Sequence, residues 1–273
     1  MPTHCSAFAD QVRHIILEQA KRAHKGHIGS ALSIADIVAA LYAGVLNIPS
    51  TDDPERDRFV LAKGHAVLAV YAALALRGFI PMGRLDTYCA DGTQLGVHPE
   101  HVVPGIDFAT GSLGQGLSQA TGCALAARMQ GSSRRVFALL SDAECNEGVV
   151  WEAAMFAAHH KLSRLVAIID LNGQQALGYT DQVLNMEPMI DRWRAFGWDA
   201  LEVDGHDVAA LMGAIAGLDF AAGPPHVILA RTVAGHGVSF MEHQIKWHYW
   251  PMSNEEYAQA VAEIGAASCD EPS

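Results

Sequence analysis

The sequence has little charge and no long hydrophobic run. Only 18% of its 273 residues are charged, and no apolar stretch reaches the roughly 18 residues that a membrane-spanning helix requires. The N-terminus lacks the apolar core of a signal peptide. These absences argue against a membrane protein and a secreted protein, and they predict a cytoplasmic location.

Basic residues are scarce as well. The chain has 18 lysines and arginines against 30 aspartates and glutamates, which gives a net charge of −12. Because nucleic acids and anionic membrane surfaces repel such a protein, neither is expected as a partner. A phosphorylated ligand would need a cation to supply positive charge locally.

Cysteines are few and scattered. The chain has five, an odd number, and no two of them form a C-x-x-C pair. This pattern is typical of free thiols in a reducing compartment, and it argues against a zinc knuckle.

Hydrophobic residues make up 50% of the chain, and their order predicts the fold. Short, continuous apolar runs alternate with helical patterns. The runs predicted as strands are 58–61, 136–140, 165–169, 200–203 and 226–230. Strands that are apolar throughout are typical of a parallel sheet covered on both faces. We therefore predict an α/β fold with a single doubly wound, mostly parallel sheet and helices on both faces.

The helical patterns complete this prediction. Apolar residues recur with the helical period at about 7–24, 66–77, 114–129, 148–160, 189–196, 207–218 and 253–264. A further helix is expected to begin at Ser33, with Asp36 as its capping partner. We assign residues 1–265 to one domain and residues 266–273 to a flexible tail.

Polar residues follow the apolar runs at the points where the strands end. Asp142 and Asn172 end two successive predicted strands, and a βαβ crossover would bring them side by side. Carboxylate and amide oxygens suit Mg²⁺ or Ca²⁺ better than zinc, and a backbone carbonyl near Gln174 would add a third ligand. Asp204 and His236 occupy similar positions after later strands. Each of these residues taken alone could equally be a helix cap or part of a turn.

A glycine-rich segment at 110–116 precedes a predicted helix. Its glycines allow a ligand to approach the backbone and the helix N-terminal N–H groups closely. A tight strand-to-helix junction is the alternative interpretation.

Histidines recur in loops, several beside glycine. His27, His65, His98 and His248 lie in such loops, where an imidazole can reach a ligand and titrate near neutrality. A single loop histidine is usually structural or solvated, so the recurrence matters more than any one of them.

Taken together, these segments resemble the N-terminal, diphosphate-binding half of transketolases, from about residue 20 to residue 250. The order and spacing of the matching segments fit the family as well as their composition does. They are KGHIGSALSIADIVAALY, DRFVLAKGHAVLAVYAAL, GVHPE, TGSLGQGLSQATG, SDAECNEGVVWEAAMFAAHHKL with IIDLNGQQALG, and VDGHD.

The resemblance implies thiamine diphosphate bound through Mg²⁺, for which Ca²⁺ or Mn²⁺ could substitute. It assigns the metal to Asp142, Asn172 and the Gln174 carbonyl. It assigns sugar binding and proton transfer, the catalytic roles, to His27, His98 and His248. The residues that it assigns to the cofactor are His65, Gly111, Ser112, Leu113, Asp142, Ala143, Glu147 and Asn172.

The chain departs from the family pattern in three respects. The usual G-D-G is Ser141-Asp142-Ala143 here, which adds two β-carbons near the diphosphate but keeps the metal carboxylate. A positive φ at Ala143 would weaken cofactor binding. No glycine follows Trp247-His248, so His236 is an alternative to His248 as the histidine of the site.

The third departure is length. Full-length transketolases carry two further domains, and the glutamate that activates the aminopyrimidine comes from the second domain of the family. The chain therefore resembles the smaller subunit of split transketolases, and we expect an α₂β₂ assembly with a partner that carries the pyrimidine-binding and C-terminal domains.

The function predicted from this resemblance is transfer of a two-carbon ketol unit from a ketose or ketose phosphate to an aldose, active only with the partner chain. Two alternatives remain open from the sequence. One is a subunit of a thiamine-dependent synthase or decarboxylase that uses pyruvate. The other is a non-catalytic, degenerate paralogue, which the Ser141-Asp142-Ala143 change alone favours.

Overall fold

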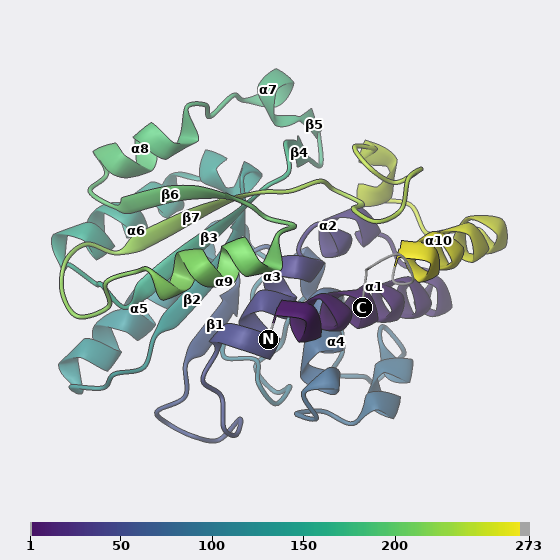
Figure 1. The fold of residues 1–273 in the computed structure, drawn as a ribbon, viewed down its shortest axis with the longest axis horizontal. Helices are drawn as coiled ribbons and strands as arrows, with labels where there is room; N and C mark the ends of the chain where they lie inside the picture. The colour runs from purple at the N-terminus through teal and green to yellow at the C-terminus, as the bar shows by residue number, and fades with distance from the viewer. Residues whose placement is uncertain (1, 268–273) are drawn as a thin grey trace.

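The computed structural model describes residues 2–267 and contains a five-stranded parallel sheet with helices on both faces (Figure 1). The strands lie in the order β1-β2-β3-β7-β6. Their bounds are β1 (Arg58–Leu61), β2 (Val136–Ser141), β3 (Leu165–Leu171), β6 (Asp199–Asp204) and β7 (His226–Arg231). The predicted fold class is confirmed, and each predicted strand matches an observed one to within two residues at either end.

Seven observed helices match predicted segments, although the first begins about five residues earlier than predicted; the short helices at 28–32 and 180–183 were not predicted. Their bounds are α1 (Pro2–Ala23), α2 (Ile28–Leu32), α3 (Ala35–Ala39), α4 (Val67–Leu76), α5 (Gln115–Met129), α6 (Gly148–His159), α7 (Thr180–Val183), α8 (Met189–Ala195), α9 (Val208–Ala216) and α10 (Asn254–Ala267). Shorter elements are the π-helical η1 (Ala40–Val45), the 3₁₀ turns η2 (Gly64–Ala66), η3 (Met82–Thr87), η4 (Ala143–Asn146) and η5 (Ile245–His248), and the small hairpin β4 (Gln174–Gln175) and β5 (Gly178–Tyr179). The sequence did not predict this hairpin.

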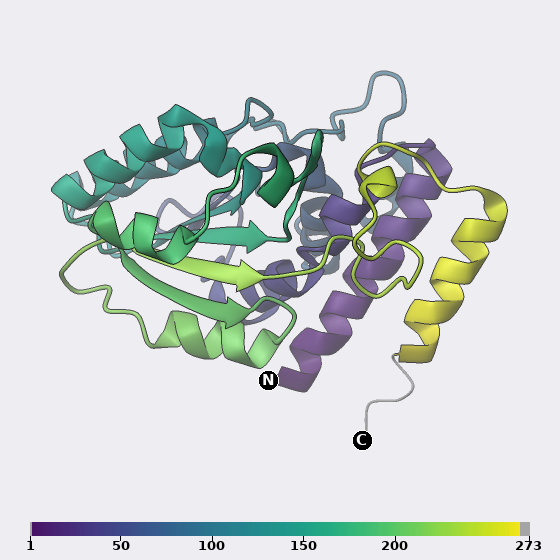
Figure 2. The ribbon, with the colours of Figure 1, turned by 90° about the horizontal axis from the view of Figure 1, so that it is seen from above.

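Right-handed crossovers explain which helices cover which face. The chain passes from β1 to β2 to β3 in one direction, and α5 and α6 connect these strands on one face. It then returns from β6 to β7, so α9 lies on the opposite face together with α1, α3 and α4. Helix α10 lies alongside α1, as both views show (Figure 1, Figure 2).

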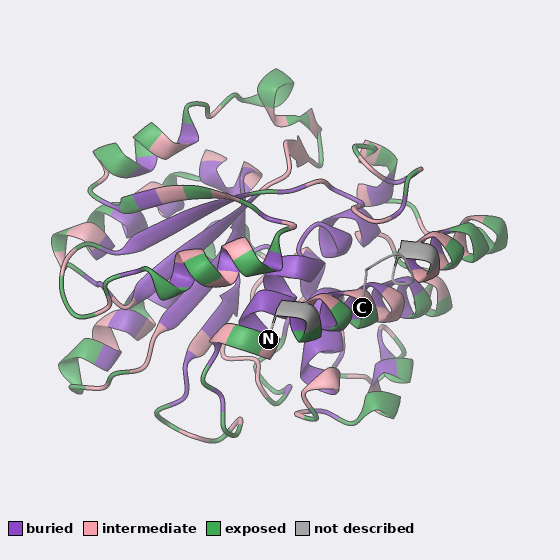
Figure 3. Ribbon diagram, in the orientation of Figure 1, coloured by how far each residue is buried: buried purple, intermediate pink, exposed green. Residues whose placement is uncertain are grey.

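Two hydrophobic cores result, one on each face of the sheet. Alternate side chains of β2 enter different cores: Phe137 and Leu139 face the α1, α3 and α4 side, whereas Val136 and Ala138 face α5 and α6. The central strands are consequently buried over nearly their whole length (Figure 3). This double burial is the physical reason for the continuous apolar runs in the sequence.

The expected cap of the second helix is wrong. Helix α3 begins after Ile34, and no side chain caps it. Ser33 Oγ donates instead to Ser30 O and to Asp170 Oδ2, while Asp36 pairs with Arg13 and His206. Both side chains have tertiary partners, which a local pattern cannot reveal.

Helix α10 extends to Ala267, two residues into the segment predicted as a tail, and residues 268–273 lie outside the described residues. In the part of the chain that the structure describes, every helix is too short or too polar to span a bilayer.

Candidate functional site

A cleft with a volume of about 330 Å³ opens at the carboxyl edge of the sheet, where ligands of such folds gather. It brings together residues from α2, η2, η5 and the turns after β2 and β3. The predicted site residues that line it are His27, His65, His98, Gly111, Leu113, Ala143, Glu147, Asn172, Gln174 and His248.

Two predicted residues do not line the cleft. Asp142 is only 3% exposed and lies between the lining residues Ser141 and Ala143. Ser112 lies in the turn between Gly111 and Leu113. The cleft therefore gathers nearly the whole predicted set from segments far apart in the sequence.

The carboxylate of Asp142 joins the ends of β2 and β3. Its Oδ1 accepts the N–H of Ala143 at 2.8 Å, and its Oδ2 accepts the N–H of Gly173 at 2.7 Å. Asn172 Oδ1 accepts the N–H of Gln174 at 2.9 Å. The carboxylate and the amide oxygen thus lie at neighbouring strand ends, as the crossover predicted.

The ionised form of the Asp142 carboxylate is unfavourable in this structure, and a bound cation would stabilise it. Burial, followed by the nearby charge of Asp170, raises the pKa of Asp142 to about 7. Among residues 2–267, no basic side chain forms an ion pair with it. The side chain of Gln174 adds a buried Nε2 without a hydrogen-bond partner. A divalent cation together with an anionic oxygen ligand fits these groups.

Beneath the cleft lies a buried ion pair that sequence reasoning missed. Lys63 and Asp170 are almost fully buried and pair with each other. Asp170 also accepts hydrogen bonds from Ser33 Oγ at 2.8 Å, from Thr232 Oγ1, and from Asn172 Nδ2 at 2.8 Å. Because the side-chain N–H of Asn172 donates to Asp170, its Oδ1, which also accepts the N–H of Gln174, is the side-chain atom with a lone pair that a ligand could use. A single carboxylate within the apolar run LVAIIDL was the available signal.

Three imidazoles form a cluster in the cleft. The ring centroids of His27, His65 and His248 lie 5.3 to 5.4 Å apart. Burial lowers the pKa of all three; it lowers that of His65 well below its usual value and that of His248 to about 4, with neighbouring histidines adding to the effect. At neutral pH the rings are therefore uncharged, and each has a nitrogen that can accept a hydrogen bond.

His98 reaches the same cleft from a different loop. Its backbone carbonyl accepts a hydrogen bond from the Tyr71 hydroxyl at 3.1 Å. Gly111 has a φ of +151°, and a β-carbon there would lie 3.2 Å from the His98 ring. A glycine is thus needed at 111 both for its backbone conformation and for the close approach of this imidazole.

The Ser141-Asp142-Ala143 variant is accommodated without backbone strain. Ala143 begins the right-handed turn η4, so the positive φ that would have weakened binding does not occur. Glu144, which sequence reasoning also missed, is fully buried and accepts the N–H groups of Gly114 and Ser141 at 2.8 and 2.9 Å. It ties the glycine-rich segment to the end of β2.

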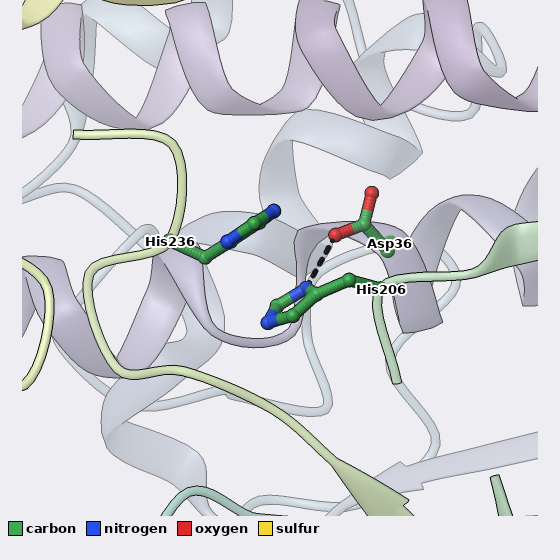
Figure 4. Close-up of side chains that lie close together, drawn as sticks. All are labelled: Asp36, His206 and His236. Atoms are coloured by element: carbon green, nitrogen blue, oxygen red, sulfur yellow. Dashed lines mark hydrogen bonds and ion pairs between the residues drawn. The ribbon is translucent and has the colours of Figure 1, made fainter. Parts of the chain in front are cut away.

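The structure separates the two histidines that the sequence left as alternatives. His248 lies in the cleft, whereas His236 stacks on His206 with a centroid distance of 3.6 Å, outside the cleft lining (Figure 4). Asp204, another polar residue at a strand end, lines a separate hollow together with His206 and His236.

Comparison with known proteins agrees with this geometry. The family described as "Transketolase, thiamine diphosphate binding domain" matches residues 5–271. The chain is 42% identical to the 6-deoxy-6-sulfo-D-fructose transketolase subunit of a Clostridium species, over 94% of both chains. It is 40% identical to an apulose-4-phosphate transketolase subunit of Phocaeicola vulgatus, over 94% of this chain and 92% of that one.

Full-length transketolases extend well beyond the match. Human transketolase is 38% identical over 94% of this chain, which spans 41% of the human protein. The crystal structure of Campylobacter jejuni transketolase superposes with a TM-score of 0.89 at 28% identity, over 96% of this chain and 42% of that one. The chain belongs to the transketolase family, whose thiamine diphosphate-binding domain it matches over nearly its full length.

Proposed function

We propose that the chain is the thiamine diphosphate-binding subunit of a two-chain transketolase. It would transfer a two-carbon ketol unit from a ketose or ketose phosphate to an aldose acceptor. The observation that carries this proposal is the cleft whose lining combines Asn172 and Gln174, beside the buried carboxylate of Asp142, with a cluster of uncharged imidazoles. The relatives named as transketolase subunits, matched over 92 to 94% of their length, support it.

In this proposal, Asp142, Asn172 and the Gln174 carbonyl hold Mg²⁺, for which Ca²⁺ or Mn²⁺ can substitute. The cofactor contacts come from His65, Gly111, Ser112, Leu113, Ala143 and Glu147. When bound, thiamine diphosphate supplies the electron sink for carbon–carbon bond cleavage. The buried charge of Asp142 and the orphan donor of Gln174 support this choice of ligands.

The histidines supply the proton chemistry of this chain. We assign His27, His98 and His248 to the sugar hydroxyls, where a neutral imidazole can accept a proton and return it later in the cycle. The lowered pKa values of His27 and His248 keep these rings uncharged at neutral pH, so their nitrogens can accept hydrogen bonds from sugar hydroxyls. Ser30 Oγ, 3.4 Å from Nδ1 of His248, helps to orient that ring.

The partner would be a second chain with pyrimidine-binding and C-terminal domains, assembled as α₂β₂. Large apolar side chains exposed beside the cleft support a covering partner: Leu177 is 80% exposed and adjoins the lining residue Ala176, and Trp250 is 63% exposed, two residues after His248. Glu147 is exposed at the cleft as well. Three relatives that are 38 to 42% identical to the chain are named transketolase subunits, which supports this function over the pyruvate-using alternative. The ordinary backbone conformation of Ala143 weakens the one feature that favoured a degenerate paralogue.

We also propose that the protein works in the cytoplasm. The free thiols of Cys5, Cys89, Cys123 and Cys145 fit a reducing compartment; Cys269 lies outside the described residues.

The metal assignment is tested by Asp142→Asn, which keeps the size of the side chain but removes its charge. In the assembled enzyme, calorimetry should show Mg²⁺-dependent affinity for thiamine diphosphate reduced at least about 100-fold, since even outer-shell partners of a metal can account for that much. The exposed Asp191→Asn on α8 is the control and should leave the affinity unchanged. Equal affinities for both variants would refute the assignment.

A further inference from the structure

The motif VDGHD contributes a histidine to a cluster of polar side chains that lies outside the proposed site. His206 of this motif, Asp36 of α3 and His236 lie close together beside the cleft-forming segments (Figure 4). Their nitrogen and oxygen atoms lie within 4.8 Å of one another, a spacing that raises the question of a metal site.

The hydrogen bonds of His206 argue against a metal ion there. Its Nδ1 lies 2.8 Å from Asp36 Oδ2, and its Nε2 lies 2.8 Å from the backbone N–H of Val233. Because a backbone N–H can only donate, Nε2 accepts and the ring proton resides on Nδ1, directed at Asp36. A metal on Nδ1 would force the proton to Nε2, where it would oppose the N–H of Val233.

An ionised Asp36 stabilises this tautomer of His206, because its carboxylate accepts the Nδ1 proton. Burial alone would raise its pKa, but the hydrogen bond from His206 and the charge of Arg13 lower it overall. Arg13 of α1 forms an ion pair with the same carboxylate. A continuous chain of contacts thus runs from α1 through α3 and His206 to Val233, in the loop that follows β7.

This chain of contacts connects the two segments that bring histidines into the cleft. The first is the segment α2–α3, which follows His27 directly. The second is the loop from 232 to 248, which ends at His248. They also meet where Gly235 N–H donates to Gly29 O at 3.0 Å, and where His27 N–H donates to the carbonyl of His248 at 3.2 Å.

We propose that His206 is a positioning residue: by donating to Asp36 and accepting the N–H of Val233, it fixes the 232–248 loop against α2–α3 and thereby sets the spacing of His27 and His248 in the cleft. The importance of that spacing for ketol transfer rests on the proposed function. The contact itself does not.

Two substitutions separate the halves of this contact. His206→Gln places an amide oxygen near the position of Nε2 and can still accept the N–H of Val233. His206→Asn can still donate to Asp36 but is too short to reach Val233. His226→Asn is a matched control, because His226 is also buried and hydrogen-bonded at both nitrogens, to Asp199 and Asp219, at the opposite edge of the sheet.

Amide hydrogen exchange of the full chain gives the first readout. In His206→Asn, exchange within 233–248 should rise roughly five- to tenfold, the factor that loss of one hydrogen bond corresponds to. His206→Gln keeps the hydrogen bond of Val233 but loses the link to Asp36, which still has Arg13 as a partner, so its exchange should lie between those of the wild type and His206→Asn. His226→Asn should leave the loop unchanged. Exchange that rises evenly along the chain in His206→Asn, or does not rise, would overturn the proposal.

Steady-state kinetics of the assembled enzyme give the second readout. His206→Asn should lower kcat by roughly tenfold to a hundredfold through misplacement of the imidazole, while affinity for thiamine diphosphate stays within about twofold. His206→Gln should lower kcat less than His206→Asn does, because the N–H of Val233 keeps its acceptor. Equal losses in the two variants would contradict a positioning role. A wild-type assembly without transketolase activity would instead refute the proposed function, and the exchange result would still decide whether His206 anchors the loop.

Discussion

The three clustered imidazoles show how the surroundings of a residue set its chemistry. His27, His65 and His248 carry ordinary side chains, yet burial lowers the pKa of each; His98 adds to the effect at His27, and Lys63 adds to it at His65 and His248. A pattern of loop histidines in the sequence can predict that imidazoles gather at a site. It cannot predict their charge, because burial and neighbours arise only from the folded arrangement.

The pKa of His248 predicts how stability depends on pH. It is about 4 in the folded chain against an ordinary value of 6.5, so the unfolded chain binds more protons between these values. Stability should therefore fall as the pH is lowered from 6.5 toward 4. His248→Gln removes this contribution, and thermal unfolding should show a smaller decrease in Tm between pH 6.5 and 4.5 than in the wild type.

The exposed His101→Gln is the control for this measurement and should follow the wild-type curve. Parallel curves for His248→Gln and the wild type would contradict the depressed pKa.

Among the elements, the carboxyl ends of three strands, β1, β3 and β7, are linked by one carboxylate. Asp170 at the end of β3 holds Lys63 after β1, Thr232 after β7 and Ser33 before α3. This network fixes the elements that surround the cleft and orients Asn172 within it. The stability of the fold and the geometry of the site therefore depend on the same buried charges.

Removal of Lys63, the positive partner of Asp170, should lower the stability of the fold. Lys63→Met leaves Asp170 buried without its counter-charge, and urea unfolding should show a loss of about 3–5 kcal/mol. Lys246→Met, which breaks the exposed pair with Glu256, should cost less than about 1 kcal/mol. Adding Asp170→Asn to Lys63→Met should recover part of the loss. Equal losses for the two single variants would contradict a structural role for the buried pair.

Elements were predictable where the pattern was local and repeated. Four of the strands, β1, β2, β3 and β7, appear in the sequence as apolar runs because they are buried on both faces, whereas β6 is partly exposed. The cap of α10 is a local pattern as well, because Ser253 and Glu256 bond each other three residues apart. The cap at Ser33 failed because its partner is Asp170, distant in the sequence. Long-range partners of polar side chains were the part that local reasoning could not supply.

Viewed as a whole, an acidic molecule presents a cleft suited to an anionic cofactor. With a net charge of −12, the chain would repel a diphosphate, so we expect bound metal to supply the local positive charge. The segments that resemble the family made it possible to predict the cofactor from the sequence. The sugar was not predictable, because the described cleft lining holds a single cationic side chain, Lys63, and that one is paired with Asp170.

The decisive experiment measures ketol transfer by the purified chain with thiamine diphosphate and Mg²⁺, with and without the protein that co-purifies with it from its native cell. We predict no transfer by the chain alone and transfer once a stoichiometric partner is added. Transfer by the chain alone would contradict the two-chain enzyme, because it would show that the active site is complete without a second subunit.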